Sequence, residues 1–378
     1  MHRHLEAARR HFEIVSAHSE YAEASDLYFD PIPKRPLFLK LHRSRWRRWA
    51  QGLDALAGIA VSYRKILTAI AARKPDLLVA VAEFPVFIPA VRAARKAGIP
   101  IIAIVHDWSP AWLDFPRKLR PLANRRFRRT CQNCTITLSV SPELAAEFGG
   151  GWRHRVLYPI PGGGLDVARA PVASRAFQII YAGIFHYFHS HEVADLCREL
   201  LKTNRSDLLR LYGPEPDWNA ETARPVRDGN FYGGMVGQSE IPPLLSNASA
   251  LLVICPFADS LAEFSRFSFP SKLTEYCRFG RPIVLWAPPE SAAVKWAEHS
   301  KAARIVTDRD ASSVVQALIE LEHDSQLCER YSAAARNEAA TTFQPERLNR
   351  IFLNALTEVF ETASKHSFHR DVPLANAI

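Results

Sequence analysis

The sequence lacks several features that define particular classes of protein. Six cysteines are scattered through 378 residues, too few and too dispersed for a disulfide framework, so a reducing compartment is expected. The closest pair, Cys131 and Cys134, has no second pair with which to form a zinc site. It also precedes a predicted strand, whereas a thioredoxin-type motif would follow one. We interpret these two residues as partly buried thiols.

Long hydrophobic runs are also missing. The longest apolar run, residues 77–91, is interrupted by Glu83 and Pro85 and is too short to span a bilayer. The first residues, MHRHLEAARRHF, are charged and helical in pattern, unlike a signal peptide. The sequence therefore predicts a cytoplasmic protein, soluble or peripheral to the inner face of a membrane.

Acidic residues are fewer than basic ones. The chain has 39 Asp and Glu against 48 Lys and Arg, a formal net charge of +9, and 48% of its residues are hydrophobic. The hydrophobic content indicates a globular protein. The positive charge favours a polyanionic partner, which can be nucleic acid, an anionic membrane surface or a phosphorylated substrate.

Short apolar runs alternate with longer amphipathic segments, which is typical of repeated βα units on a parallel sheet. Strands are predicted at 12–17, 77–82, 101–105, 135–140, 155–160, 177–183, 208–213, 230–234, 250–255, 282–287 and 303–308. The Pro- and Gly-rich stretch 158–166 divides the two series. We therefore predict an α/β protein with two doubly wound, Rossmann-like domains, residues 1–162 and 163–345, that face each other across a cleft.

Ligands of such sheets bind beyond the carboxyl ends of the strands. That rule selects four loops as candidate ligand contacts. They are residues 83–85, 106–108, 183–186 and 256–271.

The stretch FPSKLTEYCRFGRPIVLWAPPES, residues 269–291, combines a predicted helix start with a lysine and a glutamate. Pro270 suits a first helical turn, and Ser271 can cap the N–H groups there. The helix start and Lys272 offer positive charge to an anion, and Glu275, one turn on, can reach hydroxyl groups attached to it. A phosphate beside a diol describes a nucleotide, although an ordinary capped helix has the same pattern.

The second half of the chain resembles the donor domain of GT-B glycosyltransferases of the family-4 type. The segments that carry the resemblance keep their order and spacing over about 180 residues: 179–183, 209–217, 229–255, 269–291 and 341–360. The first half is similar to the partner domain through the stretches that begin at Pro75 and Thr135.

The resemblance implies transfer of a sugar from a nucleotide sugar to a glycan or lipid-linked acceptor, in surface polysaccharide or glycolipid synthesis, with no metal or other cofactor. It makes 1–162 the acceptor-side domain and 163–345 the donor domain, with a helix at 346–366 that crosses back to the first. By position, Glu275 binds the ribose, and Ser271 with Lys272 holds the diphosphate. Gly183 begins the loop that approaches the sugar and phosphates, and His106 reaches toward the donor sugar or acceptor.

The sequence departs from the family pattern in two places. Phe267 stands where many family-4 enzymes have a second glutamate, eight positions before Glu275. The lysine and arginine usual after the first donor-domain strand are replaced by GIFHYFHSH, residues 183–191. Arg266 and Lys272 are the nearest cationic substitutes, and the stereochemical outcome stays open.

An inverting reaction needs a general base near the acceptor, and the strand-end candidates are Glu83, His106 and Asp107. Each of them is equally suited to a loop cap or a hydrogen-bonded turn. No metal site is predicted from the remaining histidine cluster, because it has no clear carboxylate or cysteine partner. Its members are His186, His189 and His191.

Two basic segments, 39–56 and 117–129, lie in the first domain. Arginine with tryptophan suits an anionic membrane surface, where indole rings lie at headgroup level, although a solvated basic helix face has a similar composition. No nucleic-acid reading module accompanies the charge, so nucleic acid is not a predicted partner. The residues predicted to contact the membrane are Arg43, Arg45, Trp46, Arg47, Arg48 and Trp49.

Two other functions stay open on sequence grounds. A nucleotide-sugar epimerase uses the same architecture. A degenerate member of the family would bind a nucleotide sugar without catalysis, which the replaced glutamate and lysine make plausible.

The start of the chain resembles the interior of a domain. It opens on a helical pattern before the strand at 12–17, whereas a family member opens on a buried strand and a glycine-containing loop. We therefore expect the N-terminal domain to lack its first strand, Met1 to be an internal start, and about 15 to 20 upstream residues to encode the missing parts. A genuinely trimmed domain is the alternative.

Overall fold

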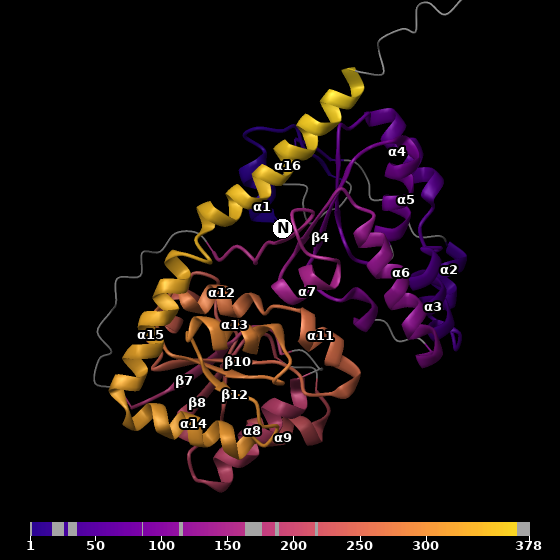
Figure 1. Cartoon of the computed structure of the whole chain (residues 1–378). Coiled ribbons are helices and arrows are strands. Elements are labelled where there is room, and N and C mark those ends of the chain that lie inside the picture. Colours follow the sequence, from indigo (N-terminus) through magenta and orange to yellow (C-terminus); the bar gives the residue numbers. More distant parts are fainter. Residues whose placement is uncertain are drawn as a thin grey trace, which may run out of the picture. The chain divides into compact units, whose positions relative to one another are not determined.

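The computed structural model describes residues 2–16, 26–28, 36–84, 86–112, 116–162, 176–185, 189–215 and 218–368. The chain divides into two units. Unit 1 is Met1–Tyr158 with Leu348–Ile378, and unit 2 is Pro159–Arg347. Each unit has a main sheet of parallel strands with helices packed against it (Figure 1). The predicted class, α/β with two Rossmann-like units, is confirmed.

The main sheet of unit 1 has the strand order β3-β4-β5-β6. Its strands are β3 (Leu78–Val81), β4 (Ile101–Val105), β5 (Ile136–Ser139) and β6 (His154–Val156). Every residue of β4 and β5 is buried, because these strands have a neighbour on each side and helices on both faces. That burial explains why they appear in the sequence as unbroken apolar runs.

A second, two-stranded sheet lies near the start of the chain. The strand predicted at 12–17 is shorter in the structure, β1 (Val15–Ser16), and it pairs in parallel with β2 (Leu27–Tyr28). We did not predict β2. Among the described residues, these two strands form a sheet of their own.

The helices of unit 1 bury mainly aromatic and small side chains. Trp108, Phe127 and Phe148 form a cluster between the sheet and its helices, with Trp108 and Phe127 ring centroids 5.2 Å apart. The thiols of Cys131 and Cys134 are buried more deeply than predicted, and burial raises the pKa of both. The helices are α1 (His2–Ala8), α2 (Pro36–His42), α3 (Arg47–Ala57), α4 (Tyr63–Arg73), α5 (Phe87–Ala97), α6 (Arg120–Gln132) and α7 (Pro142–Glu147), with 3₁₀ turns at Ser109–Trp112 and Arg117–Leu119.

The long helix α16 (Pro345–Phe368) packs beside α1 in unit 1 (Figure 1). The ring centroids of His4 and Phe352 are 5.0 Å apart, and those of Phe12 and Phe360 are 6.2 Å apart. Glu358 of α16 accepts a hydrogen bond from Arg155 in β6. In the described part of the chain, no helix has the length and hydropathy needed to cross a membrane.

Unit 2 has a six-stranded sheet of order β12-β11-β10-β7-β8-β9. The strand order reverses between β7 and β10, which lie side by side although 67 residues separate their ends, as is typical of a doubly wound sheet. The bounds are β7 (Ile179–Ala182), β8 (Leu209–Tyr212), β9 (Tyr232–Gly234), β10 (Ala250–Ile254), β11 (Ile283–Trp286) and β12 (Arg304–Val306).

The helices of unit 2 complete its core. They are α8 (Ser190–Lys202), α9 (Ala220–Asp228), α10 (Ile241–Ser246), α11 (Ala262–Phe267), α12 (Ser271–Cys277), α13 (Ala292–Ser300), α14 (Ala311–His323) and α15 (Ser325–Ala340), with 3₁₀ turns at Ser206–Leu208 and Asp259–Leu261. The predicted linker ends outside the described residues, which stop at Gly162 and resume at Ala176.

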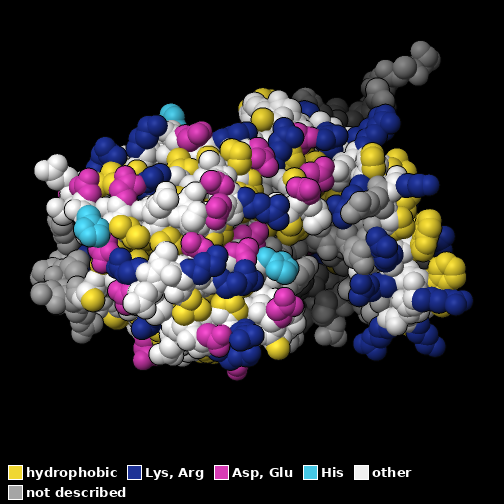
Figure 2. Space-filling model, turned by 90° about the horizontal axis from the view of Figure 1, so that it is seen from below, with side chains coloured by type: hydrophobic (Ala, Val, Ile, Leu, Met, Phe, Trp, Pro, Cys, Tyr) yellow, Lys and Arg dark blue, Asp and Glu magenta, His cyan; other side chains and the backbone are white. Residues whose placement is uncertain are grey.

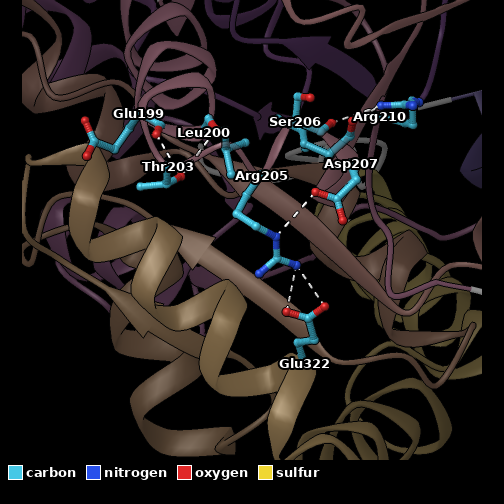
Figure 3. A network of polar contacts seen from close by, with 9 residues as sticks. Glu199, Leu200, Thr203, Arg205, Ser206, Asp207, Arg210 and Glu322 are labelled. Carbon is cyan, nitrogen blue, oxygen red and sulfur yellow. Dashed lines mark hydrogen bonds and ion pairs between the residues drawn. The ribbon is translucent and has the colours of Figure 1, made fainter.

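A network around Arg205 ties the turn between α8 and β8 to α14 (Figure 3). Both oxygens of Glu322 accept hydrogen bonds from one guanidinium nitrogen at 2.8 Å, and Asp207 accepts another at 3.3 Å. The hydrogen bond to Glu322 raises the pKa of Arg205. The network therefore joins α14 to the turn before β8, one of the strands that carry the candidate site.

Two glycines of unit 1 allow a test of helix packing. Gly58 ends α3 with φ +61°, and a Cβ there would lie 2.5 Å from Pro89 Cδ of α5, whereas Gly150 has φ +65° and open space around it. We expect Gly58→Ala to lower the free energy of unfolding by roughly 2 to 5 kcal/mol, because backbone strain and overpacking add. Gly150→Ala should cost only the strain, roughly 1 to 2 kcal/mol. Chemical denaturation of both variants measures the difference, and equal losses would contradict the packing of α3 on α5.

Candidate functional site

The candidate site lies at the carboxyl ends of β7, β8 and β10, where the strand order of unit 2 reverses. Gly183 follows β7 and Gly213 follows β8, and both have a positive φ, +141° and +154°. A Cβ on Gly213 would lie 2.1 Å from the carbonyl oxygen of Gly183, so only glycine permits this approach of the two loops. Such a reversal point is where open parallel sheets bind their ligands.

Helix α12 is hydrogen-bonded to the end of β7. The hydroxyl of Tyr276 accepts a hydrogen bond from the backbone N–H of Ala182 and donates one to its carbonyl, both at 3.0 Å. One turn earlier, Lys272 Nζ lies 4.8 Å from the ring centre of Tyr181. A Cβ on Gly183 would lie 2.9 Å from that Nζ, so the missing side chain makes room for the lysine.

Lys272 is partly buried, and its ammonium group contacts an aromatic ring. Within the described part of the chain no carboxylate pairs with it. Burial lowers the pKa of Lys272 to about 8, with a smaller opposing effect from the thiol of Cys255 at the end of β10. A cation held in this way is available to an anionic ligand.

Glu275 is engaged by two groups of unit 2. Its Oε1 accepts a hydrogen bond from the backbone N–H of Gly162 at 2.6 Å, and its Oε2 accepts one from Arg278 at 3.3 Å. The carboxylate is about one-third exposed. The structure therefore gives Glu275 a tie to the segment that enters unit 2, which sequence reasoning did not predict.

The start of α12 differs from its prediction. Pro270 is the N-cap rather than a residue of the first turn, and no side chain caps the helix, so the predicted capping by Ser271 is wrong. Pro270 is extended and has no polar side-chain group that could cap the helix, and Ser271 is the first residue of the helix itself. Ser271 is exposed.

Arg266, the other predicted cationic residue, lies on α11. It is exposed, and its guanidinium carbon lies 4.9 Å from the ring centre of Phe267. Phe267, at the position of the replaced glutamate, is buried in the core. The described contacts of Arg266 therefore do not join it to Lys272.

Sequence reasoning missed three side chains of the site: Tyr181, Glu192 and Tyr276. The hydroxyl of Tyr181 is 2.9 Å from His189 Nε2. Glu192 Oε1 accepts a hydrogen bond from the N–H of Phe257 at 2.9 Å. Glu192 is buried and ties the first turn of α8 to the loop after β10. The spacing of Tyr276, four residues after Lys272 on one helix face, was a usable signal.

In unit 1 the predicted strand-end residues lie at one edge of the sheet. The register of β3 on β4 pairs Val81 with Ile104, so Glu83 and His106 follow neighbouring parallel strands. Glu83 is exposed, whereas His106 and Asp107 are partly buried. Burial lowers the pKa of His106 to about 4, so its imidazole is neutral at neutral pH.

The histidine cluster is only partly described. His186 lies outside the described residues, His189 is buried against Tyr181, and His191 is exposed. Among the described residues, no group of three or more His, Cys, Asp or Glu side chains has the arrangement of a metal site.

Comparisons with known proteins agree with this architecture. Residues 2–163 match the family model of Glycosyltransferase Family 4. The chain is similar to the solved structure of Anabaena HepE in complex with UDP and glucose, with 15% identity and a TM-score of 0.63, over 94% of this chain and 95% of that one. It is similar to a glycosyltransferase from Rickettsia africae, with 13% identity and a TM-score of 0.64 over 94% of both chains.

A putative UDP-N-acetylglucosamine 2-epimerase from Listeria monocytogenes is also similar, with 11% identity and a TM-score of 0.59, over 96% of this chain and 93% of that one. The search of curated proteins gave no match. At these identities the solved structures establish the fold, which is GT-B. The resemblance to family-4 type GT-B glycosyltransferases is confirmed, and the family match falls on the half where fewer motifs carried it.

The lowered pKa of Lys272 gives a test of its environment. Its folded value, about 8, is below the ordinary 10.5, so between these values the unfolded chain holds more protons and stability rises with pH. Below pH 8 the buried charge opposes folding. We therefore expect Lys272→Met to raise the stability of the ligand-free protein at pH 7 by about 1 to 2 kcal/mol.

Chemical denaturation of wild type and variant at several pH values measures this effect. The difference should shrink as the pH rises from 8 to 10.5, because the wild-type lysine then loses its proton in the folded state. Lys295→Met, at an exposed position of α13, is the control and should show no such pH dependence. A Lys272→Met protein less stable than wild type at pH 7 would contradict the argument.

Proposed function

We propose that the protein is a glycosyltransferase that moves a sugar from a nucleotide-sugar donor to a glycan or lipid-linked acceptor. The observation that carries the proposal is Lys272. A partly buried ammonium group with no carboxylate partner among the described residues lies at the reversal point of a doubly wound sheet. Its burial costs stability, and an anionic ligand offsets that cost.

The donor contacts follow from the chemistry of each group. Lys272 and the exposed Ser271 at the start of α12 bind the diphosphate, and the Gly183 loop approaches the phosphates and sugar without a side chain in the way. Glu275 accepts hydrogen bonds from the ribose hydroxyls through its exposed part. Arg266 supplies further positive charge from α11.

The reaction proceeds without an essential metal. Lys272 and the N–H groups at the start of α12 meet the negative charge that builds on the leaving diphosphate. If the reaction inverts the anomeric centre, a base of unit 1 takes the proton of the acceptor hydroxyl. His106 is one candidate, because its imidazole is neutral at neutral pH, although a pKa of about 4 makes it a weak base. Glu83 and Asp107 are the other strand-end candidates.

We further propose that the enzyme works in surface polysaccharide or glycolipid synthesis, in the cytoplasm at the inner face of a membrane. The support is the basic, Trp-bearing segment of residues 43–49, whose side chains are all exposed. A lipid-linked acceptor lies at such a surface, so contact with the membrane raises the encounter rate.

Incubation with labelled nucleotide sugars tests the proposed activity. Transfer to an acceptor, or slow hydrolysis of the donor, supports it. Inversion at C2 of the sugar would replace it with an epimerase, the activity that the shared fold leaves open. Retained nucleotide binding with no turnover of any donor would make the protein a binding member of the family.

Substitution of Glu275 tests the ribose contact. Glu275→Ala should weaken binding of the nucleoside diphosphate about 5- to 150-fold, because loss of a hydrogen-bond partner costs about 1 to 3 kcal/mol. It should also lower the thermal midpoint, because it releases the N–H of Gly162. Glu275→Gln keeps an acceptor for Gly162 and is the control for the second effect. Calorimetry showing unchanged affinity in Glu275→Ala would remove Glu275 from the site.

A further inference from the structure

Helix α3 has large hydrophobic side chains on its solvent face. Trp46, Trp49 and Leu53 follow one another at spacings of three and four residues, which places them on one side of the helix. Their exposed fractions are 52%, 52% and 49%. The helix packs onto unit 1 through its buried residues, which are Ala50, Gly52, Asp54 and Ala55. Trp46, Trp49 and Leu53 are not among them.

The two helices that pack against α3 have the same character. Leu37 of α2 is 72% exposed, and Leu122 of α6 is 52% exposed. Arg125 and Arg129 are exposed at three and seven residues after Leu122, on the same side of α6. We call the exposed side chains of α2, α3 and α6, together with residues 43–46 before α3, the α2/α3/α6 face.

The charge of this face is of one sign. Residues 36–57 contain five Lys and Arg, and residues 117–132 contain seven. The single acidic residue of the two segments is Asp54, which is buried and accepts a hydrogen bond from the N–H of Ala60 at 3.0 Å. At the right of Figure 2, on unit 1, dark blue and yellow side chains gather with few magenta ones among them.

Exposed apolar side chains of this size, on helices that also carry exposed arginines, mark a surface that binds a partner. A second copy of the same face is a poor cover, because two surfaces of like charge would repel. A nucleic acid would satisfy the arginines but would leave the three leucines without an apolar partner. An anionic lipid bilayer satisfies both, with phosphates for the guanidinium groups and an acyl boundary for the apolar side chains.

We propose that the α2/α3/α6 face docks onto an anionic lipid bilayer, with Trp46, Trp49 and Leu53 at the boundary between headgroups and acyl chains. This inference deepens the membrane association in the proposed function. It adds α6 and the apolar row of α3 to the basic segment read from the sequence. Binding is therefore both electrostatic and hydrophobic, and each part is separately measurable.

Co-sedimentation with vesicles tests the docking without any need for a donor or acceptor. Wild type should bind vesicles of phosphatidylglycerol and phosphatidylcholine, and not vesicles of phosphatidylcholine alone. Replacing Arg43, Arg45, Arg47 and Arg48 with Gln should reduce partitioning by about a thousand-fold at low salt. The triple variant Trp46→Ser, Trp49→Ser, Leu53→Ser should reduce it by at least about ten-fold, because it removes the apolar area that enters the boundary.

Trp152→Ser is the matched control. Trp152 is 59% exposed in unit 1, and the guanidinium of Arg153 lies 5.3 Å from its ring, much as that of Arg45 lies 5.5 Å from the ring of Trp46. It belongs to the turn before β6, outside the α2/α3/α6 face, and its loss should leave vesicle binding unchanged. Unchanged thermal midpoints of all variants show that unit 1 is folded, and unchanged nucleotide affinity shows that unit 2 is intact.

Three results would overturn the proposal. The first is failure of wild type to sediment with the anionic vesicles. The second is full binding by the triple variant, which would leave only a non-specific charge effect. The third is a wild-type dimer in light scattering that the triple variant dissociates while vesicle binding is unchanged, which would assign the face to self-association. A protein that docks but transfers no sugar would instead contradict the proposed function and leave this inference standing.

Discussion

The close approach of two backbone loops, after β7 and after β8, is the constraint on which the rest of the candidate site depends. The carbonyl of Gly183 occupies the space that a side chain on Gly213 would need. Just before this point, Tyr276 of α12 hydrogen-bonds to both backbone polar groups of Ala182, the last residue of β7. The same helix then presents Lys272 to the gap left by Gly183. The absence of a side chain at Gly213 therefore lets the two loops meet, and its absence at Gly183 leaves room for the ammonium group of Lys272.

Placing a lysine at this point opposes the stability of unit 2. Its ammonium group gains an aromatic face but, among the described residues, no carboxylate, and burial shifts its pKa downward. Proteins accept such costs where a ligand relieves them. The neighbouring contacts of Glu192 with Phe257 and of Tyr181 with His189 join the loops around it. The site thus combines loops joined by hydrogen bonds with a lysine that, among the described residues, pairs with no carboxylate.

In unit 1 the large apolar side chains are not all in the core. Small and aromatic side chains pack against its sheet, and α3 is buried through alanines and Asp54. The large side chains of α3, Trp49 and Leu53, are therefore exposed to solvent, as are Arg125 and Arg129 of α6. The family match covers this unit. The α2/α3/α6 face consists of exposed residues, which the fold does not need for its packing.

The sequence alone determined the layout of the fold. Strands such as β4 and β10 are unbroken apolar runs because both faces of a parallel sheet are covered, so a local pattern was enough to find them. It also placed Lys272 and Glu275 one turn apart, although their ligand roles remain predictions. Only the tertiary structure decided what these groups touch: Glu275 meets Gly162, 113 residues away, and Tyr276 meets Ala182, 94 residues away. Strands β1 and β2 likewise exist only as a pair. Hydrophobic periodicity depends only on residues that are close in the sequence. A hydrogen bond between distant residues depends on how the packed core positions the two chain segments.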